Sequence, residues 1–325
     1  MAWEVAVAGT VTLDDVTTPT GHRTELQGGS AVYFALAASR FAPVHVVGTV
    51  GMDGVEPLEQ AIEGCEVFTD GVDRIDTPTM RWWAHHDFDS WVTADERTEQ
   101  GAYENWRPNL PAAAAAAPVF FVGSMRPDQQ VEALRQSHAA LIGSDSMTVY
   151  IGGGGPDVRA VAEASDILFL NRSELSGLTG LASDDWLQAA RSLCGRGRLR
   201  AVVVKGGPLG AAVVTASSVV ERQAHPVEKV LDPTGAGDSL AGGFLGACAR
   251  AERDDDAFFA TALDEGLRCA ADAIVAFGTA ALHHRATTVH LIPEGGTLSS
   301  GRSPAADDGV GVLPPPGAPA PRRTR

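Results

Sequence analysis

Short apolar runs and amphipathic stretches alternate along most of the chain. The apolar runs are bounded by Gly, Pro or polar residues, which is typical of buried strands. They predict strands at Trp3–Gly9, Val44–Val50, Val119–Val122, Thr148–Ile151, Ile167–Leu170 and Ala201–Lys205. The stretches between and after them predict helices at Gly28–Phe41, Pro57–Cys65, 127–142, 156–164, 183–194, Ala236–Ala251 and Ala257–Phe277. This alternation indicates βαβ units, and so an α/β fold whose parallel sheet is covered on both faces.

Two segments interrupt the alternation. Residues 10–27 are polar, and residues 77–106 alternate partly with period two and carry no helical stripe. The second segment is rich in tryptophan, at Trp82, Trp83, Trp91 and Trp106. Together they predict a small β-flap that projects from the sheet. The pattern leaves open whether the flap covers a cleft or only extends an edge.

Residues 293–325 differ from the rest in composition. They are rich in Pro, Gly and Ser and have no periodic apolar positions. Such a segment buries too little apolar surface to offset the entropy lost on ordering. We therefore expect one compact domain over residues 1–292, followed by a disordered tail.

The charge balance and the cysteines limit the partners and the location. The chain has 325 residues, with 25 Lys and Arg against 41 Asp and Glu, for a net charge of −16. This excess of acid argues against nucleic acid or an anionic membrane as a partner. No apolar run has the length of a membrane span, and the N-terminus lacks signal-peptide features. The 4 cysteines form no C-x-x-C pair, which fits a reduced cytoplasm rather than a disulfide or zinc framework.

The most specific chemical signal is DPTGAGDSLAGGFLG at Asp232–Gly246, which follows a β-like stretch and opens a helix. Gly235, Ala236 and Gly237 allow a tight turn at the N-terminus of that helix. Unpaired N–H groups and the helix dipole make such a turn suited to a phosphate or a developing oxyanion. Asp238 is either an ordinary residue of the first helical turn or a base that takes a proton from an attacking hydroxyl. The pattern alone leaves both open.

DPTGAGDSLAGGF resembles the C-terminal signature of the ribokinase-like (pfkB) carbohydrate kinases. Other landmarks of that family follow in the same order: AGTVTLD at Ala8–Asp14, the glycine pair Gly28–Gly29, N-x-x-E at Asn171–Glu174 and KGGPLGA at Lys205–Ala211. The resemblance covers about residues 3–285, and the GGSAVYF start looks closest to a poorly characterised bacterial group of sugar kinases. It implies a doubly wound, mostly parallel α/β sheet with a β-flap lid, and ATP and Mg²⁺ as cofactors.

The resemblance also assigns roles around the phosphoryl group. Asp238 matches the catalytic base, and the backbone of Gly235, Ala236 and Gly237 matches the anion hole. Phosphoryl transfer depends mainly on positioning and charge neutralisation, so these groups and a metal form a sufficient set.

The same comparison predicts the acceptor site. Asp14 matches the acid that binds acceptor hydroxyls, and Gly28 and Gly29 let the acceptor approach the backbone. Ser30 and Tyr33 belong to the same segment. Tyr33 stands where sugar-specific ribokinases have an asparagine, which makes ribose itself doubtful as the acceptor.

On the nucleotide side, Asn171 and Glu174 match the residues that order Mg²⁺ and the phosphates through water. This pair is also typical of a helix cap with its capping-box partner. Lys205, Gly207 and Gly210 match the nucleotide turn, although a lysine at a strand end is equally typical of a surface. Two more residues, Asp232 and Thr234, match a loop that binds a monovalent cation such as K⁺ in several relatives.

The resulting hypothesis is a kinase that transfers the γ-phosphoryl group of ATP to a hydroxymethyl group of a small sugar or polyol. A nucleoside kinase is the alternative, favoured by Tyr33 and the tryptophan-rich flap, whose rings could stack on a base. A catalytically silent sugar- or nucleotide-binding relative is a second alternative, against which the retained GAGD turn argues. A dehydrogenase is excluded by the missing G-x-G-x-x-G fingerprint. We also expect a homodimer through the flap.

Overall fold

The computed structural model describes residues 4–88, 92–152, 156–250 and 256–290. The chain divides into two units, Met1–Leu291 and Ile292–Arg325. The second unit, with the tail expected at 293–325, lies outside the described residues. No helix in the described part of the chain is both long and apolar enough to cross a bilayer.

The first unit is built on a main sheet of nine described strands, in the order β13-β12-β11-β10-β9-β8-β1-β4-β5. These strands are β1 (Val5–Ala8), β4 (Val44–Gly51), β5 (Val67–Ile75), β8 (Val119–Val122), β9 (Leu141–Asp145), β10 (Ile167–Asn171), β11 (Ala201–Lys205), β12 (Ala211–Thr215) and β13 (Val219–Arg222). All neighbouring pairs from β11 to β5 are parallel, and β12 and β13 add an antiparallel edge. The mostly parallel α/β sheet is therefore confirmed.

The chain changes direction at β1, which pairs with β4 on one side and with β8 on the other. In an open α/β sheet such a switch point leaves a crevice at the carboxyl ends of the strands, where ligands bind. The glycine pair at Gly28–Gly29 opens the helix beside this point.

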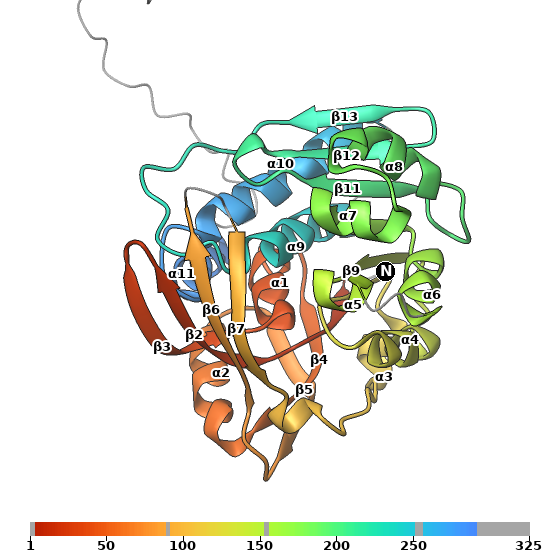
Figure 1. The fold of residues 1–325 in the computed structure, drawn as a ribbon. Helices are drawn as coiled ribbons and strands as arrows, with labels where there is room; N and C mark the ends of the chain where they lie inside the picture. The colour runs from red at the N-terminus through yellow and green to blue at the C-terminus, as the bar shows by residue number, and fades with distance from the viewer. Residues whose placement is uncertain (1–3, 89–91, 153–155, 251–255, 291–325) are drawn as a thin grey trace, which may run out of the picture. The chain divides into compact units, whose positions relative to one another are not determined.

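Helices cover both faces of the sheet (Figure 1). They are α1 (Ser30–Ala38), α2 (Val55–Ile62), α3 (Ala112–Ala116), α4 (Pro127–Gln136), α5 (Thr148–Gly152), α6 (Pro156–Ala164), α7 (Arg172–Thr179), α8 (Trp186–Leu193), α9 (Ala236–Ala249), α10 (Asp256–Ala273) and α11 (Ala280–His290). Alternate residues of β1 pack in opposite directions, as the pleat requires. Val5 and Val7 join the core with α1, α9 and α10, whereas Ala6 and Ala8 join the core with α3 and α4.

A separate four-stranded sheet forms the flap, in the order β3-β2-β6-β7. Its strands are β2 (Thr12–Thr18), β3 (Gly21–Gly28), β6 (Met80–Asp87) and β7 (Val92–Glu99). They come from the two segments 10–27 and 77–106, so the small β-flap is confirmed. Trp91 lies outside the described residues. We call this sheet the lid.

Two element predictions around residue 145 were wrong. The helix expected over 127–142 ends at Gln136, and the strand expected at Thr148–Ile151 is the short helix α5. Between them lies β9, whose sequence LIGSD has the composition of a turn. Gly143 sits in this strand because α9 packs closely: a Cβ there would lie 2.6 Å from Cδ1 of Leu245. Tertiary packing thus overrides local propensity.

The end of the domain also differs from the prediction. Two long helices were expected to close it, and a third, α11, follows α10. Its sequence AALHHRATTVH has no strong apolar stripe. Packing against α1, α2 and α10, rather than amphipathic periodicity, defines it.

Candidate active site

The N-terminus of α9 carries the GAGD turn. Gly235 caps the helix in the left-handed conformation, with φ of 73°, which favours glycine. The N–H groups of Gly235, Gly237 and Asp238 make no backbone hydrogen bond among the described residues. They lie at the positive end of the helix dipole, so the turn suits an anion.

Asp238 lies in the first turn of α9. Burial, together with the charges of Asp145 and Glu174 and against the opposing charge of Lys205, raises the pKa of this carboxyl to about 7. A carboxyl with a pKa near neutrality exchanges a proton readily at physiological pH, which is the property required of a general base.

Lys205, at the end of β11, is nearly buried, with 15% of its side chain exposed. Its Nζ donates to Oδ2 of Asp145 at 2.7 Å and lies 3.7 Å from Oε2 of Glu174. Burial disfavours the ammonium, but these two carboxylates outweigh it and hold the pKa of Lys205 above its ordinary value. A Cβ on Gly237 would lie 3.4 Å from Nζ. Lys205 is therefore a buried cation beside the anion turn and not a surface residue.

Asn171 and Glu174 form a capping box at the start of α7. The side chain of Asn171 accepts from the N–H of Glu174 at 2.8 Å, and the side chain of Glu174 accepts from the N–H of Asn171 at 2.8 Å. Burial raises the pKa of Glu174, with Lys205 opposing. The capping role is real, and the box also holds Glu174 against Lys205. The structural interpretation of this motif is therefore confirmed, and its match to the residues that order Mg²⁺ and the phosphates stays a prediction.

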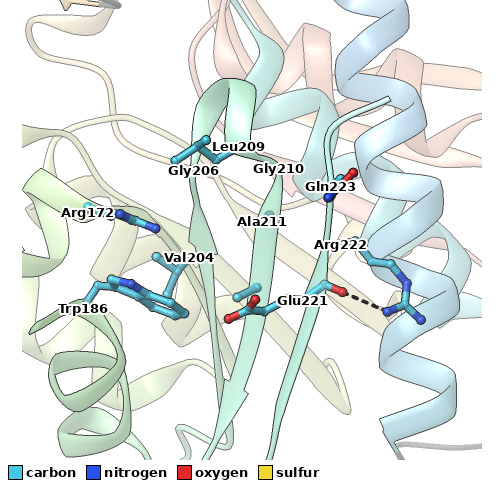
Figure 2. Close-up of a pocket in the computed structure, with 11 residues that line it drawn as sticks. Arg172, Trp186, Val204, Gly206, Leu209, Gly210, Ala211, Glu221, Arg222 and Gln223 are labelled. Carbon is cyan, nitrogen blue, oxygen red and sulfur yellow. Dashed lines mark hydrogen bonds between the residues drawn. The ribbon is translucent and has the colours of Figure 1, made fainter. Parts of the chain in front are cut away.

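The predicted nucleotide turn connects β11 to β12. Gly207 and Gly210 both have positive φ, at 57° and 93°, and a Cβ on Gly210 would lie 2.0 Å from the carbonyl oxygen of Arg222. Figure 2 shows this turn above the edge of the sheet, with Arg172 and Trp186 on one side. A pocket of about 440 Å³ lies there. Its lining includes Arg172 of α7 and Trp186 of α8 but not Lys205.

Asp14 lies on β2 where the lid leaves the main sheet, and 3% of it is exposed. Burial, together with the charges of Asp232, Asp15 and Asp238, raises its pKa to about 7. Oδ1 is buried without a hydrogen-bond partner among the described residues. A Cβ on Gly28 would lie 1.9 Å from Oδ2 of Asp14. The glycine therefore makes room for this carboxylate, which keeps unused hydrogen-bonding capacity.

Gly29 and Ser30, also expected on the acceptor side, lie at the start of α1. Gly29 has φ of 100°, and a Cβ there would meet the carbonyl oxygen of Thr10 at 2.3 Å. Ser30 was expected to serve the acceptor, but its hydroxyl accepts from the N–H of Thr10 and donates to the carbonyl oxygen of Ser124. These bonds hold the start of α1 against the ends of β1 and β8. The structure therefore gives Ser30 a supporting position.

Tyr33 is 2% exposed, and its ring packs against the anion turn: a Cβ on Gly235 would lie 2.2 Å from Cδ1. Burial raises the pKa of Tyr33 well above its usual value, and the charges of Asp232, Asp14 and Asp238 add to this. The phenol is therefore a neutral group among the carboxylates of both halves of the site.

Asp232 and Thr234, expected to bind a monovalent cation, use their side-chain oxygens in contacts within the protein. The carboxylate of Asp232 accepts from the N–H of Thr234 at 2.9 Å and from the N–H of Gly278 at 3.1 Å. The hydroxyl of Thr234 is hydrogen-bonded to Nε2 of His86 at 2.9 Å. All three side-chain oxygens thus have a protein partner, so a monovalent cation would have to share or displace these contacts.

Sequence reasoning missed two residues of this site. Asp145 ends β9, which has the composition of a turn, and no motif marks it. His86 comes from the lid, and only the pairing of β6 with β2 brings it to Thr234. One signal for His86 was available in the sequence: on a predicted strand His85 and His86 point to opposite faces, so one of them faces inward. Among the described residues no group of three or more His, Cys, Asp or Glu is arranged to hold a metal ion.

Comparison with known proteins gives a consistent result. The family model for pfkB family carbohydrate kinases matches residues 7–284. A cytidine kinase of Thermococcus kodakarensis is 29% identical over 254 residues, covering 76% of this chain and 89% of that protein. The fold is similar to an adenosine kinase of Sinorhizobium meliloti, with TM-score 0.74 at 20% identity over 89% of this chain and 99% of that one. It is also similar to an Arabidopsis thaliana ribokinase complexed with ribose and ATP, with TM-score 0.71 at 19% identity over 90% and 100%.

Proposed function

This chain belongs to the pfkB family of carbohydrate kinases, and on that basis we propose that it transfers the γ-phosphoryl group of ATP to a hydroxymethyl group of a nucleoside or a small sugar. One observation carries the proposal. The carboxylate of Asp238 is buried in the first turn of α9, beside N–H groups that make no backbone hydrogen bond among the described residues. Its negative charge helps to raise the pKa of Asp14 in the lid. A base, an anion site and an acceptor-binding carboxylate thus meet at one place.

In the proposed reaction Asp238 takes the proton of the acceptor hydroxyl as its oxygen attacks the γ-phosphorus. A new P–O bond forms, the bond to the β-phosphate oxygen breaks, and ADP leaves. The N–H groups of Gly235 and Gly237 stabilise charge on the transferring group, whereas the N–H of Ala236, expected to join them, donates to the carbonyl oxygen of Pro233 at 3.3 Å. Lys205 adds a fixed positive charge near the same turn. These are the positioning and electrostatic terms on which phosphoryl transfer depends.

Mg²⁺ belongs to the proposal, and K⁺ does not. Mg²⁺ keeps several waters and binds few protein groups besides phosphates. Glu174 fits such a site through water, because the capping box and Lys205 engage Oε2 and leave Oε1 without a hydrogen bond among the described residues. When bound with ATP, the ion would neutralise charge on the phosphates.

We favour a nucleoside as the acceptor. A cytidine kinase of Thermococcus kodakarensis is similar over 76% of this chain. In the lid, the indole Nε1 of Trp82 is buried without a partner among the described residues, as is Oδ1 of Asp14, its register neighbour on β2. Unpaired buried polar atoms each cost about 1–3 kcal/mol, which a ligand with hydroxyl and amide groups would recover.

The test is ATP consumption by the purified protein against cytidine, uridine, adenosine, inosine, ribose, fructose and inositol. We expect the highest kcat/KM for a nucleoside, with phosphate appearing on its 5′-hydroxyl. Free ribose or fructose as the best acceptor would return the assignment to a sugar kinase. Turnover with none of these compounds would support the catalytically silent alternative.

We also propose a cytoplasmic location, where ATP is supplied, and a homodimer through the lid. The lid leaves β3 and β7 as edge strands, and unpaired edges favour association. Sedimentation at micromolar concentration tests the dimer independently of the activity.

A further inference from the structure

The lid is attached to the segment that leads into the anion turn, at two points. At the first point the hydroxyls of Thr18 and Thr20 both donate to the carbonyl oxygen of Leu231 at 3.0 Å. At the second, Nε2 of His86 is hydrogen-bonded to the hydroxyl of Thr234 at 2.9 Å. Residues 231–234 are followed directly by Gly235, so both attachments act on the backbone that begins the turn.

The second attachment is deeply buried. His86 is 4% exposed, and Nε2 also lies 3.8 Å from Oδ1 of Asp232, which is 1% exposed. The indole of Trp82 meets the imidazole edge-to-face at 6.2 Å between ring centroids. A buried hydrogen bond between neutral groups costs more to break than an exposed one, because the partners are left without water. The contact is therefore a firm link between β6 and the loop.

The two attachments belong to one rigid unit. Strands β2 and β6 are parallel neighbours, and Thr17 is the register partner of His85. Thr18 and His86 are the next residues along these two strands. A movement of the lid that carries Asp14 away from the acceptor therefore also pulls on Leu231 and Thr234.

We infer that His86 is a positioning residue that links the lid to residues 232–234 in place of a monovalent cation, so that closing the acceptor site and setting the anion turn are one event. The inference rests on the proposed kinase function. Its physical basis is the steep dependence of transfer rates on geometry, since a displacement of about 1 Å costs on the order of 100-fold. His86 touches neither reactant in this account and acts through Thr234.

The central test compares four variants. His86→Ala removes the imidazole of the link. Thr234→Val removes the hydroxyl that the imidazole contacts but keeps the shape of the side chain. His86→Gln keeps a side-chain amide that can reach Thr234. His85→Ala is the matched control, because His85 is the exposed neighbour on the same strand. We expect His86→Ala and Thr234→Val each to lower kcat about 10- to 100-fold, within the geometric limit above, with KM for ATP changed less than 2-fold. The double variant should be no worse than either, and His86→Gln should recover most of kcat.

Equal kcat for His86→Ala and His85→Ala would overturn the inference, as would strictly multiplicative losses in the double variant. Asp238→Asn is measured alongside. If it retains wild-type turnover, the proposed function fails; if it is inactive while His86→Ala is normal, only the inference fails.

Two further measurements do not depend on His86 variants folding or on turnover. Wild-type thermal unfolding in KCl should match that in tetramethylammonium chloride at equal ionic strength. A K⁺-specific rise in the midpoint would show that a cation holds the loop and would overturn the inference. Hydrogen exchange in Thr234→Val should increase at residues 231–238 and remain unchanged in β10 and β11. Unchanged exchange at 231–238 would also overturn it.

Discussion

Asp145 of β9 reaches across β10 to Lys205 of β11, with 2.7 Å between Oδ2 and Nζ. The pair lies beside the anion turn, and the negative charge of Asp145 helps to raise the pKa of Asp238. Asp145 thus holds Lys205 in place and also affects the protonation of Asp238, the proposed base.

A pH profile tests this arrangement. Asp238 must be ionised to accept a proton, and its pKa is about 7, so kcat/KM for the acceptor should rise with pH through neutrality and fall tenfold per unit well below it. Asp145→Asn removes a charge that raises this pKa and leaves Lys205 freer to lower it. The acid limb should therefore move to lower pH, even if maximal turnover falls. Asp157→Asn, an exposed site on α6, serves as the control, and an acid limb that does not move in Asp145→Asn would contradict the assignment.

Asp238→Asn keeps the shape of the first turn of α9 but removes the proton acceptor. A positioned general base contributes about 100- to 10,000-fold, and we expect turnover to fall by that amount. ATP affinity, measured by calorimetry, should change little because the N–H groups of the turn remain. Turnover near that of the wild type would refute the mechanism.

The same substitution should stabilise the protein at alkaline pH. The pKa of Asp238 is 3.8 in the reference state and about 7 when folded, so between these values the folded chain holds a proton that the unfolded chain has lost. Stability falls with rising pH wherever the folded state binds more protons. Removing this carboxyl should therefore raise the free energy of unfolding at pH 8 by roughly 1–4 kcal/mol, and by much less at pH 4. Urea unfolding at both pH values measures this; a gain that is equal at the two would rule out an ionisation cost as its cause.

Asp14 should affect the affinity for the acceptor but not the affinity for ATP. Asp14→Ala removes a buried carboxylate whose Oδ1 has no partner among the described residues, so KM for the acceptor should rise at least 10-fold, as expected for a lost charge-assisted hydrogen bond. KM for ATP should stay within 2-fold. A collapse of ATP binding with unchanged acceptor affinity would reverse the assignment of the two halves of the cleft.

The lid tryptophans should respond differently to the acceptor. The indole N–H of Trp82 is buried and unpartnered among the described residues, whereas the ring of Trp83 is already covered by Arg97, 4.7 Å from its centroid. Acceptor binding should change Trp82 fluorescence, and ATP alone should not. The change should be lost in Trp82→Phe and retained in Trp83→Phe. The opposite pattern would mean that the other face of the lid meets the acceptor.

Local patterns predicted the parts of this site that lie within continuous segments. The DPTGAGD turn, the glycine pair and the capping box each depend on residues a few positions apart, so spacing and residue type were sufficient. The positions of Asp145 and His86 in the site depend on the order of the strands and on the docking of the lid. A short stretch of sequence contains neither. Ser30 was expected to bind the acceptor, and spacing alone did not reveal that its hydroxyl is hydrogen-bonded to Thr10 and Ser124, which follow β1 and β8.

The contact between Tyr33 and Gly235 restricts how this enzyme can acquire a new acceptor. The ring that borders the acceptor side is also the surface against which the catalytic turn rests. A smaller residue at 33, chosen to admit a bulkier sugar, would leave a void behind Gly235, and any side chain at 235 would collide with the ring. Directed evolution of specificity should therefore recover few single changes at position 33. We expect successful lineages to vary the lid first and to alter Tyr33 only after a compensating change has filled the space behind the turn.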